Sequence, residues 1–288
     1  MKNTSATMTI NCKDKTGIVA GVSNFLHKNG CNITSLDQYT TDPEGGKFFM
    51  RIAFEISEQT LEAEKFKDDF HQSTSHVFDM EWNIHFKEDR KRIAILCSKE
   101  EHALLDLLWS HQQGQIDADI PLVLSNHASV ESSVKPFNAQ FKHIANTKDI
   151  REAAEAEILE ALMDHNIDCV VLARYMQILS PNFVSNYPQS IINIHHSFLP
   201  AFIGANPYKQ ALDKGVKLIG ATAHYVSDAL DEGPIIDQET KHISHSCSLQ
   251  DLKILGQTIE KTVLTRAVKH HIEDRVILDG NKTIVFTR

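Results

Sequence analysis

Residues 191–200, Ile-Ile-Asn-Ile-His-His-Ser-Phe-Leu-Pro, join a short apolar strand to polar side chains that suit catalysis. Residues two apart on an extended strand project to the same side, so Asn193 and His195 aim an amide and an imidazole at one point. Both groups donate hydrogen bonds, as the oxyanion of an acyl-transfer reaction requires. The stretch therefore predicts a strand whose end carries an acyl-transfer site.

A carboxylate on a later loop would complete this set. Residues 231–234 read Asp-Glu-Gly-Pro. Asp231 beside His195 would keep the imidazole cationic, because a nearby opposite charge raises the pKa of a histidine. The alternative is that Asn193 and His195 cap a turn and that Asp231 is a solvated loop residue.

Two further segments extend the pattern, residues 220–226 (GATAHYV) and 233–239 (GPIIDQE). Together with residues 191–200 they resemble the formyltransferase fold family, whose members take a formyl group from 10-formyltetrahydrofolate. The resemblance extends from Arg92 to the C-terminus. It implies that Asn193, His195 and Asp231 are the catalytic residues.

The order of strands and helices over residues 93–288 is consistent with this resemblance. Strands are expected at 93–97, 122–125 and 169–173, with helices at about 100–112 and 149–163 between them, as in a mostly parallel, Rossmann-like α/β sheet. A capping box at Ser248 opens a long helix that we expect to be scaffold rather than site. Residues 276–286, interrupted by Asp-Gly-Asn, are expected to form a terminal hairpin.

The strand at 169–173 runs into Arg-Tyr-Met-Gln-Ile-Leu-Ser-Pro, residues 174–181. Ligands of open parallel sheets bind beyond the carboxyl ends of the strands. The resemblance implies that this loop receives the pterin ring, although its apolar residues could also plug the core. The expected folate-binding residues are Arg174, Met176, Gln177, Ile178, Leu179, Ile203 and Gly204.

Residues 1–86 predict a separate βαββαβ domain, followed by a charged linker at 87–92. The segment resembles the ACT domain, a ferredoxin-like module that often binds amino acids. The resemblance implies a possible effector site at Asp14, Gly17, Ile18 and Asn32, with methionine or glycine as the effector. The alternative is a domain that mediates only oligomerisation, and the partners expected in either case include further copies of this chain.

Composition limits the classes of partner. With 288 residues, 42% apolar and 23% charged, the chain has the balance of a globular two-domain protein. Its net charge of −9 disfavours a nucleic-acid surface. A polar start and the lack of a long apolar run predict a cytoplasmic protein without a membrane segment. Five scattered cysteines predict reduced thiols, and no metal-ligand spacing is present.

The acceptor of the formyl group is the remaining question. Residues 97–102, Cys-Ser-Lys-Glu-Glu-His, lack the glycine-containing phosphate loop of glycinamide ribonucleotide formyltransferase, and their two carboxylates would repel a phosphate. The surplus of acidic residues disfavours tRNA. Water remains, and the whole chain then resembles the formyltetrahydrofolate deformylase family, an ACT domain followed by this catalytic domain.

This resemblance implies hydrolysis of 10-formyltetrahydrofolate to formate and tetrahydrofolate, which would supply formate for purine synthesis. The folate is the substrate, so no cofactor is expected. Two alternatives stay open: a formyltransferase that uses an unfamiliar amine, and a sensor of folate or amino acids without catalysis.

Overall fold

The computed structural model describes residues 3–42, 44–57, 62–201 and 207–287, which fall into two compact units. The first comprises the described residues up to Arg90, with Asp274–Asp279 and the described residues from Ile284 onward. The second comprises Lys91–Glu273 and Gly280–Thr283. Each unit is described by itself below.

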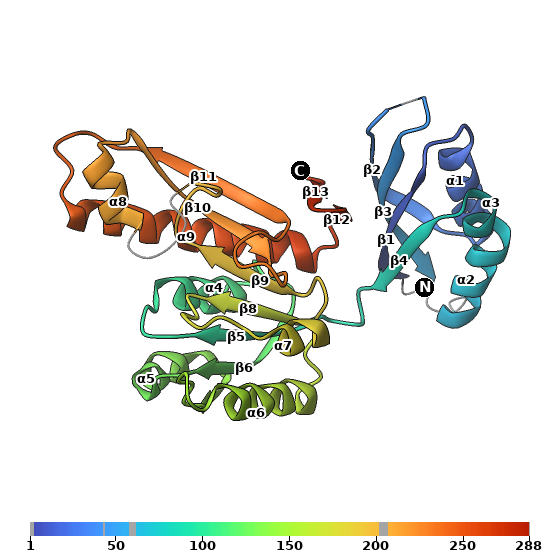
Figure 1. Ribbon diagram of the computed structural model, residues 1–288. Helices are drawn as coiled ribbons and strands as arrows, with labels where there is room; N and C mark the ends of the chain where they lie inside the picture. Colours follow the sequence, from blue (N-terminus) through green and yellow to red (C-terminus); the bar gives the residue numbers. More distant parts are fainter. Residues whose placement is uncertain (1–2, 43, 58–61, 202–206, 288) are drawn as a thin grey trace. The chain divides into compact units, whose positions relative to one another are not determined.

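The first unit is a four-stranded antiparallel sheet in the order β2-β3-β1-β4 (Figure 1). This is the ferredoxin-like arrangement that the sequence predicted. A π-helical turn, His71–Ser75, continues its second helix. The elements are β1 (Asn3–Lys13), α1 (Ile18–Lys28), β2 (Asn32–Thr40), β3 (Lys47–Ser57), α2 (Ala63–Phe70), α3 (His76–Phe78) and β4 (Glu81–Phe86).

The two faces of this sheet are buried by different parts of the chain. Alternate residues of β3, among them Met50 and Phe54, pack with α1 and α2 in one apolar core. Phe49 points to the other face and is covered by Ile277 and Phe286. From the sequence, residues 276–286 were expected to belong to the second domain. The spacing of apolar residues along the chain does not show against which sheet they pack.

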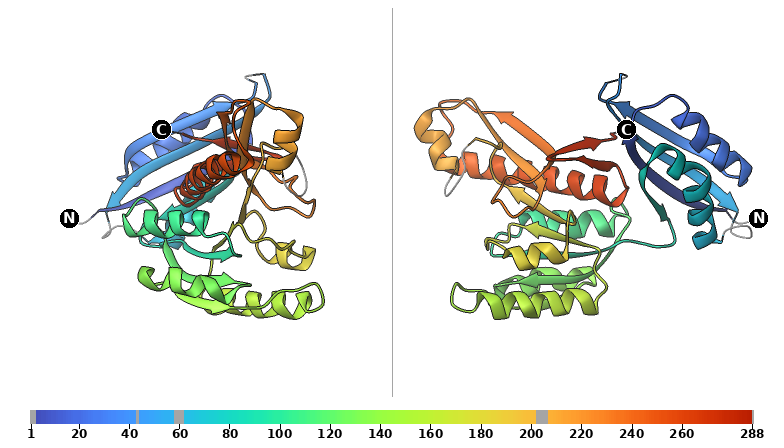
Figure 2. Two further views of the ribbon diagram at one scale, coloured as in Figure 1. Left: turned by 90° about the vertical axis from the view of Figure 1, so that its left-hand side faces the viewer. Right: turned by 45° about the vertical axis from the view of Figure 1, so that its right-hand side comes forward.

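The second unit is a seven-stranded sheet in the order β11-β10-β9-β8-β5-β6-β7. Figure 2 shows its ribbon from two further sides. Strands β5 to β9 run parallel to one another, and β10 runs antiparallel to both of its neighbours, β9 and β11. The strands are β5 (Arg92–Cys97), β6 (Asp119–Ser125), β7 (Gln140–His143), β8 (Cys169–Ala173), β9 (Ile191–His195), β10 (Leu218–Tyr225) and β11 (Ile235–His242). The mostly parallel sheet is confirmed.

The helices of this unit are α4 (His102–Gln112), α5 (Glu131–Val134), α6 (Arg151–Asp164), α7 (Pro181–Asn186), α8 (Pro207–Lys214) and α9 (Leu249–Ile272). A terminal hairpin of β12 (Val276–Asp279) and β13 (Lys282–Val285) follows α9, as expected. None of the helices in the part of the chain that the structure describes has the length and hydrophobicity needed to cross a lipid bilayer.

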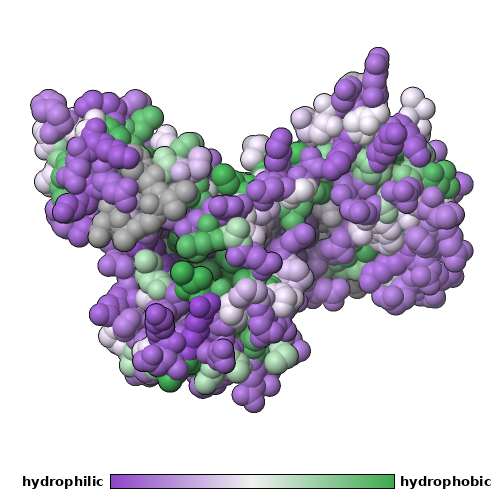
Figure 3. All heavy atoms as spheres, in the orientation of Figure 1, coloured by the Kyte–Doolittle hydropathy of each residue, from purple (hydrophilic) through white to green (hydrophobic). Residues whose placement is uncertain are grey.

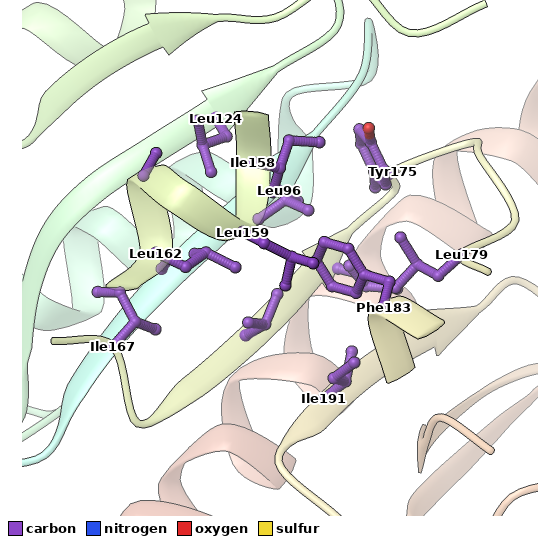
Figure 4. Close-up of a cluster of buried hydrophobic side chains, with 14 of the residues drawn as sticks. Leu96, Leu124, Ile158, Leu159, Leu162, Ile167, Tyr175, Leu179, Phe183 and Ile191 are labelled. Carbon is purple, nitrogen blue, oxygen red and sulfur yellow. The ribbon is translucent and has the colours of Figure 1, made fainter. Parts of the chain in front are cut away.

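One apolar core joins α6 and α7 to the parallel strands (Figure 4). Ile158 and Leu162 of α6 lie over Leu96 of β5, and Phe183 of α7 is fully buried beside them. Helical spacing on α6 and continuous apolar runs on the strands produce this layer, because parallel strands are covered on both faces. The core holds the carboxyl ends of β5 and β8 at fixed positions.

The direction in which the chain adds strands reverses between β5 and β8. From β5 it proceeds to β6 and β7 on one side, and then returns to β8 and β9 on the other. The connections leaving the carboxyl ends of β5 and β8 therefore diverge, and a crevice opens between them. A ligand site is expected there.

Helix α9 begins with the predicted capping box. Ser248 Oγ accepts a hydrogen bond from the Asp251 backbone amide at 3.2 Å, and the Asp251 carboxylate accepts one from the Ser248 amide at 2.8 Å. We expect Ser248→Ala to lower the free energy of unfolding by about 1 kcal/mol. Urea denaturation would measure this, with Ser246→Ala as the control; equal stability of the two variants would contradict a capping role.

Candidate active site

A cavity of about 660 Å³ lies at the carboxyl ends of the parallel strands in the second unit. Asn193 and His195 enter it from β9, and the loop after β8 forms another part of its lining. Asp231 enters from the loop between β10 and β11. The structure therefore brings the three residues named from the sequence into one cavity.

The link between His195 and Asp231 is direct. His195 Nδ1 lies 3.2 Å from Asp231 Oδ2, and both side chains are largely buried. The hydrogen bond from His195, reinforced by His224, lowers the pKa of Asp231 well below its usual range. Asp231 therefore stays ionised and faces the imidazole with a full negative charge.

His195 Nε2 is buried, and among the described residues it has no hydrogen-bond partner. The other ring nitrogen is held by Asp231, so the orientation of the ring is fixed. A buried polar atom without a partner is costly, and such atoms are rare outside functional sites. His195 lines the cavity, so its Nε2 is a hydrogen-bonding group at the site that the described residues leave unused.

His224 of β10 is a further member of this group that the sequence reasoning did not assign. It stands opposite Asn193 in the register of β9 and β10. Its Nδ1 donates to the Tyr225 carbonyl at 2.9 Å, and its Nε2 lies 3.1 Å from Asn193 Nδ2. Nε2 also lies 3.7 Å from Asp231. The segment 220–226 was noticed, but only strand pairing shows that its histidine contacts Asn193.

The loop after β8 forms an apolar wall of the cavity. The exposed fractions of Met176 and Ile178 are 57% and 60%, so both apolar side chains are open to a ligand. Figure 3 shows hydrophobic side chains gathered on this unit within a mostly hydrophilic surface. Five of the expected folate-binding residues line the cavity, while Ile203 and Gly204 lie outside the described residues. The five are Arg174, Met176, Gln177, Ile178 and Leu179.

These five residues do not all have the same environment. Leu179 is only 8% exposed and also belongs to the apolar core, so the core-plug alternative describes part of its role. Met176 is fixed through its backbone amide, which donates to Ser98 Oγ at 3.1 Å. The wall therefore has an anchored backbone and free apolar side chains, an arrangement suited to a flat aromatic ring.

A polar cluster around Glu260 forms another wall. The Glu260 side chain is 1% exposed; it accepts from His102 Nε2 at 2.9 Å and from the Tyr208 hydroxyl, and pairs with Arg174 Nε at 3.4 Å. Burial would raise the pKa of Glu260, but the His102 hydrogen bond and the Arg174 charge outweigh it and hold the pKa at about 2. Glu260 belongs to α9, so the expectation that this helix is only scaffold was wrong.

The position of Arg174 suggests that its side chain is needed there. Its φ of 62° lies in the left-handed region, where residues other than glycine are uncommon. Such strained positions cluster at functional sites. The side chain reaches the cavity next to Glu260, so the strained backbone directs a guanidinium into the site.

Gly256 sets the distance between α9 and Tyr208. A Cβ atom at this position would lie 2.0 Å from the Tyr208 hydroxyl and 2.3 Å from its ring carbon Cζ. We expect Gly256→Ala to displace Tyr208 from Glu260 and to lower the free energy of unfolding by about 1–3 kcal/mol. Thermal denaturation of Gly256→Ala and of the double variant Gly256→Ala, Tyr208→Ala would test this. A double variant no more stable than the single one would contradict a clash with Tyr208.

Two side chains with nucleophilic groups are unsuited to covalent catalysis. Burial raises the pKa of Cys97 to about 12, and Ser197 Oγ donates to the Ala201 carbonyl at 2.8 Å. Across the described residues, no group of three or more His, Cys, Asp or Glu side chains is arranged to hold a metal ion. The cavity instead offers hydrogen-bond donors and a fixed carboxylate.

The residues expected for an effector site lie in the first unit, three of them at the turn between β1 and α1. Asp14 accepts a hydrogen bond from Thr40 Oγ1 at 2.8 Å. Gly17, with φ 95°, is the N-cap of α1, a conformation that glycine adopts without strain. The Ile18 side chain is buried in the core, so only its backbone is accessible to a ligand.

Asn32 does not join these three within one chain. It begins β2 and pairs with Glu55 of β3, which in turn pairs with Ser5. Lys13, adjacent to Asp14, pairs with Lys47 at the other end of β3. Asn32 and Asp14 therefore lie at opposite ends of the sheet, because α1 carries the chain back along its length. The four residues do not form one site in a single copy of the chain.

Comparison with known proteins agrees with the fold and with the contents of the cavity. The sequence model of the formyl transferase family matches residues 91–268. That of the ACT domain matches residues 6–70. Along the chain the ACT match comes first and the formyl transferase match second. The protein therefore belongs to the class in which an ACT domain is joined to a formyl transferase domain.

Individual relatives narrow the class. Formyltetrahydrofolate deformylase of Bacillus subtilis (strain 168) is 51% identical over 277 residues, which cover 96% of this chain and 92% of the relative. The crystal structure of a formyltetrahydrofolate deformylase from Pseudomonas syringae pv. tomato superposes with a TM-score of 0.92 at 42% identity, covering 100% of this chain and 95% of the other. The chain belongs to the formyltetrahydrofolate deformylase family.

The catalytic unit alone also resembles a transferase. Glycinamide ribonucleotide transformylase 1 from Symbiobacterium toebii superposes with a TM-score of 0.66 at 28% identity, covering 71% of this chain and 98% of that protein. The two kinds of protein therefore share a fold, and the side chains of the cavity must distinguish their acceptors.

Proposed function

We propose that this chain hydrolyses 10-formyltetrahydrofolate to formate and tetrahydrofolate. The observation that carries the proposal is His195, a residue of the cavity lining whose Nδ1 is held by Asp231 and whose buried Nε2 has no hydrogen-bond partner among the described residues. Family membership supports the same reaction, since relatives across nearly the whole chain are named for it.

In this proposal Asn193 and His195 stabilise the oxyanion. Water attacks the formyl carbon, and the carbonyl electron pair moves to its oxygen. The Asn193 amide and the His195 imidazolium donate to that oxygen, and Asp231 stabilises the cation through Nδ1. The bond from carbon to N10 then breaks as N10 takes the proton that the attacking water released, and the formic acid that leaves ionises to formate.

The side of the cavity at Glu100 supports water as the acceptor. Glu100 lines the cavity with a half-exposed carboxylate, and the segment between β5 and α4 lacks the glycine that would let its backbone close around a phosphate. This carboxylate disfavours a phosphorylated amine through charge repulsion and admits a neutral water molecule. A transferase using another amine is the second candidate, favoured by the fold shared with the transformylase.

The reaction can be tested directly. Purified protein is incubated with 10-formyltetrahydrofolate without any amine, and formate and tetrahydrofolate are both measured, with His195→Gln as the control. Equal amounts of the two products from wild type, and their loss in the variant, support hydrolysis at this site. An intact substrate that is consumed only when an amine is added would support a transferase instead.

Regulation and assembly form part of the proposal. The ACT match supports an amino-acid effector such as methionine or glycine. Because Asn32 lies far from the other three effector residues in one chain, we infer that a second copy of the chain completes the site in a homo-oligomer. Titration calorimetry with each amino acid, at protein concentrations above and below dissociation of the oligomer, would test both statements.

The proposal also covers the need for a cofactor, the metabolic role of the reaction and the location of the protein. The folate is consumed as substrate, and the proposed mechanism requires no cofactor. Formate release links the reaction to purine synthesis. The described cysteines are unpaired, as in a reducing compartment, which supports a cytoplasmic location.

A further inference from the structure

His196 lies in the cavity beside His195, although alternation along a strand would direct it to the opposite face. Strand β9 ends at His195, and the chain bends there. Both imidazoles consequently line the same cavity, with ring centroids 5.3 Å apart. The second histidine is therefore close to the oxyanion donors without belonging to them.

The other basic groups near the oxyanion donors are already engaged. Asp231 contacts His195 and His224, and these contacts lower its pKa, which makes it a weak base. The His224 ring uses Nδ1 toward the Tyr225 carbonyl and Nε2 toward Asn193. His195 must carry a proton to stabilise the oxyanion. Each of the three is thus already in contact with another member of the group.

His196 is different in this respect. Among the described residues, no hydrogen bond occupies either nitrogen of its ring. Burial, reinforced by the positive charge of Arg174, lowers the pKa of His196 to about 4, so the ring is neutral near pH 7 and has a free lone pair.

The Glu260 cluster fixes the surroundings of this ring. The centroid of His196 lies 6.1 Å from that of Tyr208, which hydrogen-bonds to Glu260. Glu260 in turn holds Arg174, the charge that keeps His196 neutral. The groups that act on the ring electrostatically are Arg174, Glu260, His195 and Asp231. The Glu260 cluster thus holds Arg174 next to the ring of His196, beside His195.

We propose that His196 is the general base of the hydrolysis, a role that rests on the proposed function. A ring nitrogen of His196 takes one proton from water as the oxygen bonds to the formyl carbon and the carbonyl electron pair moves to its oxygen. When the bond from carbon to N10 breaks, the same proton passes to N10. Formic acid and tetrahydrofolate form, and His196 is neutral again, so the step balances without another reactant.

The test compares His196→Gln and His196→Ala with wild type, and uses His245→Gln, an exposed histidine outside the cavity, as the matched control. Glutamine keeps polarity and comparable size but cannot take a proton. We expect kcat for formate release to fall by about 100- to 10,000-fold in both His196 variants, with KM changed by less than about threefold. The control should match wild type.

Chemical rescue separates a base from a structural residue. In folded His196→Ala, added imidazole should restore formate release in proportion to the concentration of its neutral form, and methyl-substituted imidazoles of higher pKa should work better. Imidazole should leave wild type unchanged. Near-normal kcat in His196→Gln, or no rescue of folded His196→Ala by any of these bases, would overturn the proposal. Wild type that releases no formate would instead overturn the proposed function.

Discussion

Asp231→Asn is expected to lower kcat for formate release by about 100- to 1000-fold while leaving KM within about threefold. Asparagine has nearly the same shape and can still accept from His195 Nδ1, but it carries no charge. The imidazolium that donates to the oxyanion loses its counter-ion, which lies 3.2 Å away in the wild type. The effect falls on the transition state, because the ground-state formyl oxygen carries no full negative charge.

Steady-state kinetics with 10-formyltetrahydrofolate would measure both constants. The control is Asp213→Asn, the same change on the exposed surface of α8. Circular dichroism and binding of a folate analogue would establish that the fold and the donor site persist in Asp231→Asn. A variant that keeps kcat within a few-fold of wild type would remove Asp231 from the catalytic set.

Glu260→Ala is expected to have the largest effect on stability, a loss of about 3–5 kcal/mol in the free energy of unfolding. The substitution leaves Arg174 charged and without its counter-ion in a largely buried wall, and it removes the acceptor of His102 and Tyr208. Urea denaturation at neutral pH would measure the loss. The control Glu157→Ala removes a half-exposed carboxylate from α6 and should cost less than about 0.5 kcal/mol.

Stability at low pH provides a second test of Glu260. Its pKa is lowered from 4.5 to about 2 in the folded protein, so its contribution is fully present above about pH 4.5 and is lost as the pH falls toward 2. The difference in unfolding free energy between wild type and Glu260→Gln should therefore be constant from pH 7 to 5 and then shrink. A difference that grows on acidification would show that Glu260 is not ionised in the folded state.

Much of the fold followed from patterns within single segments. The strand at 169–173 has the predicted bounds, and the helices after β5 and before β8 begin within two residues of expectation, because apolar periodicity reports directly on burial. The antiparallel pairing of β10 with β9 and β11 was not predicted from the sequence. Whether β10 runs parallel or antiparallel to β9 depends on how the connection crosses the sheet, and local periodicity carries no such information.

The residues of the candidate site also fall into those that the sequence could identify and those that it could not. Asn193 and His195 could be paired from the sequence because they belong to one strand, and Asp231 could be added from a family resemblance. His224 and Glu260 could not be found in this way. They meet the site from β10 and α9 through strand register and helix packing, and a buried carboxylate on a polar helix has the same sequence signature as a solvated one.

By itself the sequence determined the two kinds of domain, the strand that presents Asn193 and His195, and the apolar loop after β8. These depend on interactions between near neighbours, which spacing encodes. Only the tertiary structure decided which polar groups share the cavity, that His196 joins His195 there, that Asn32 is remote from Asp14, and that the C-terminal segment covers Phe49. Those outcomes depend on contacts between residues far apart in the sequence. Such contacts form only when all the helices and strands pack together, so local spacing does not encode them.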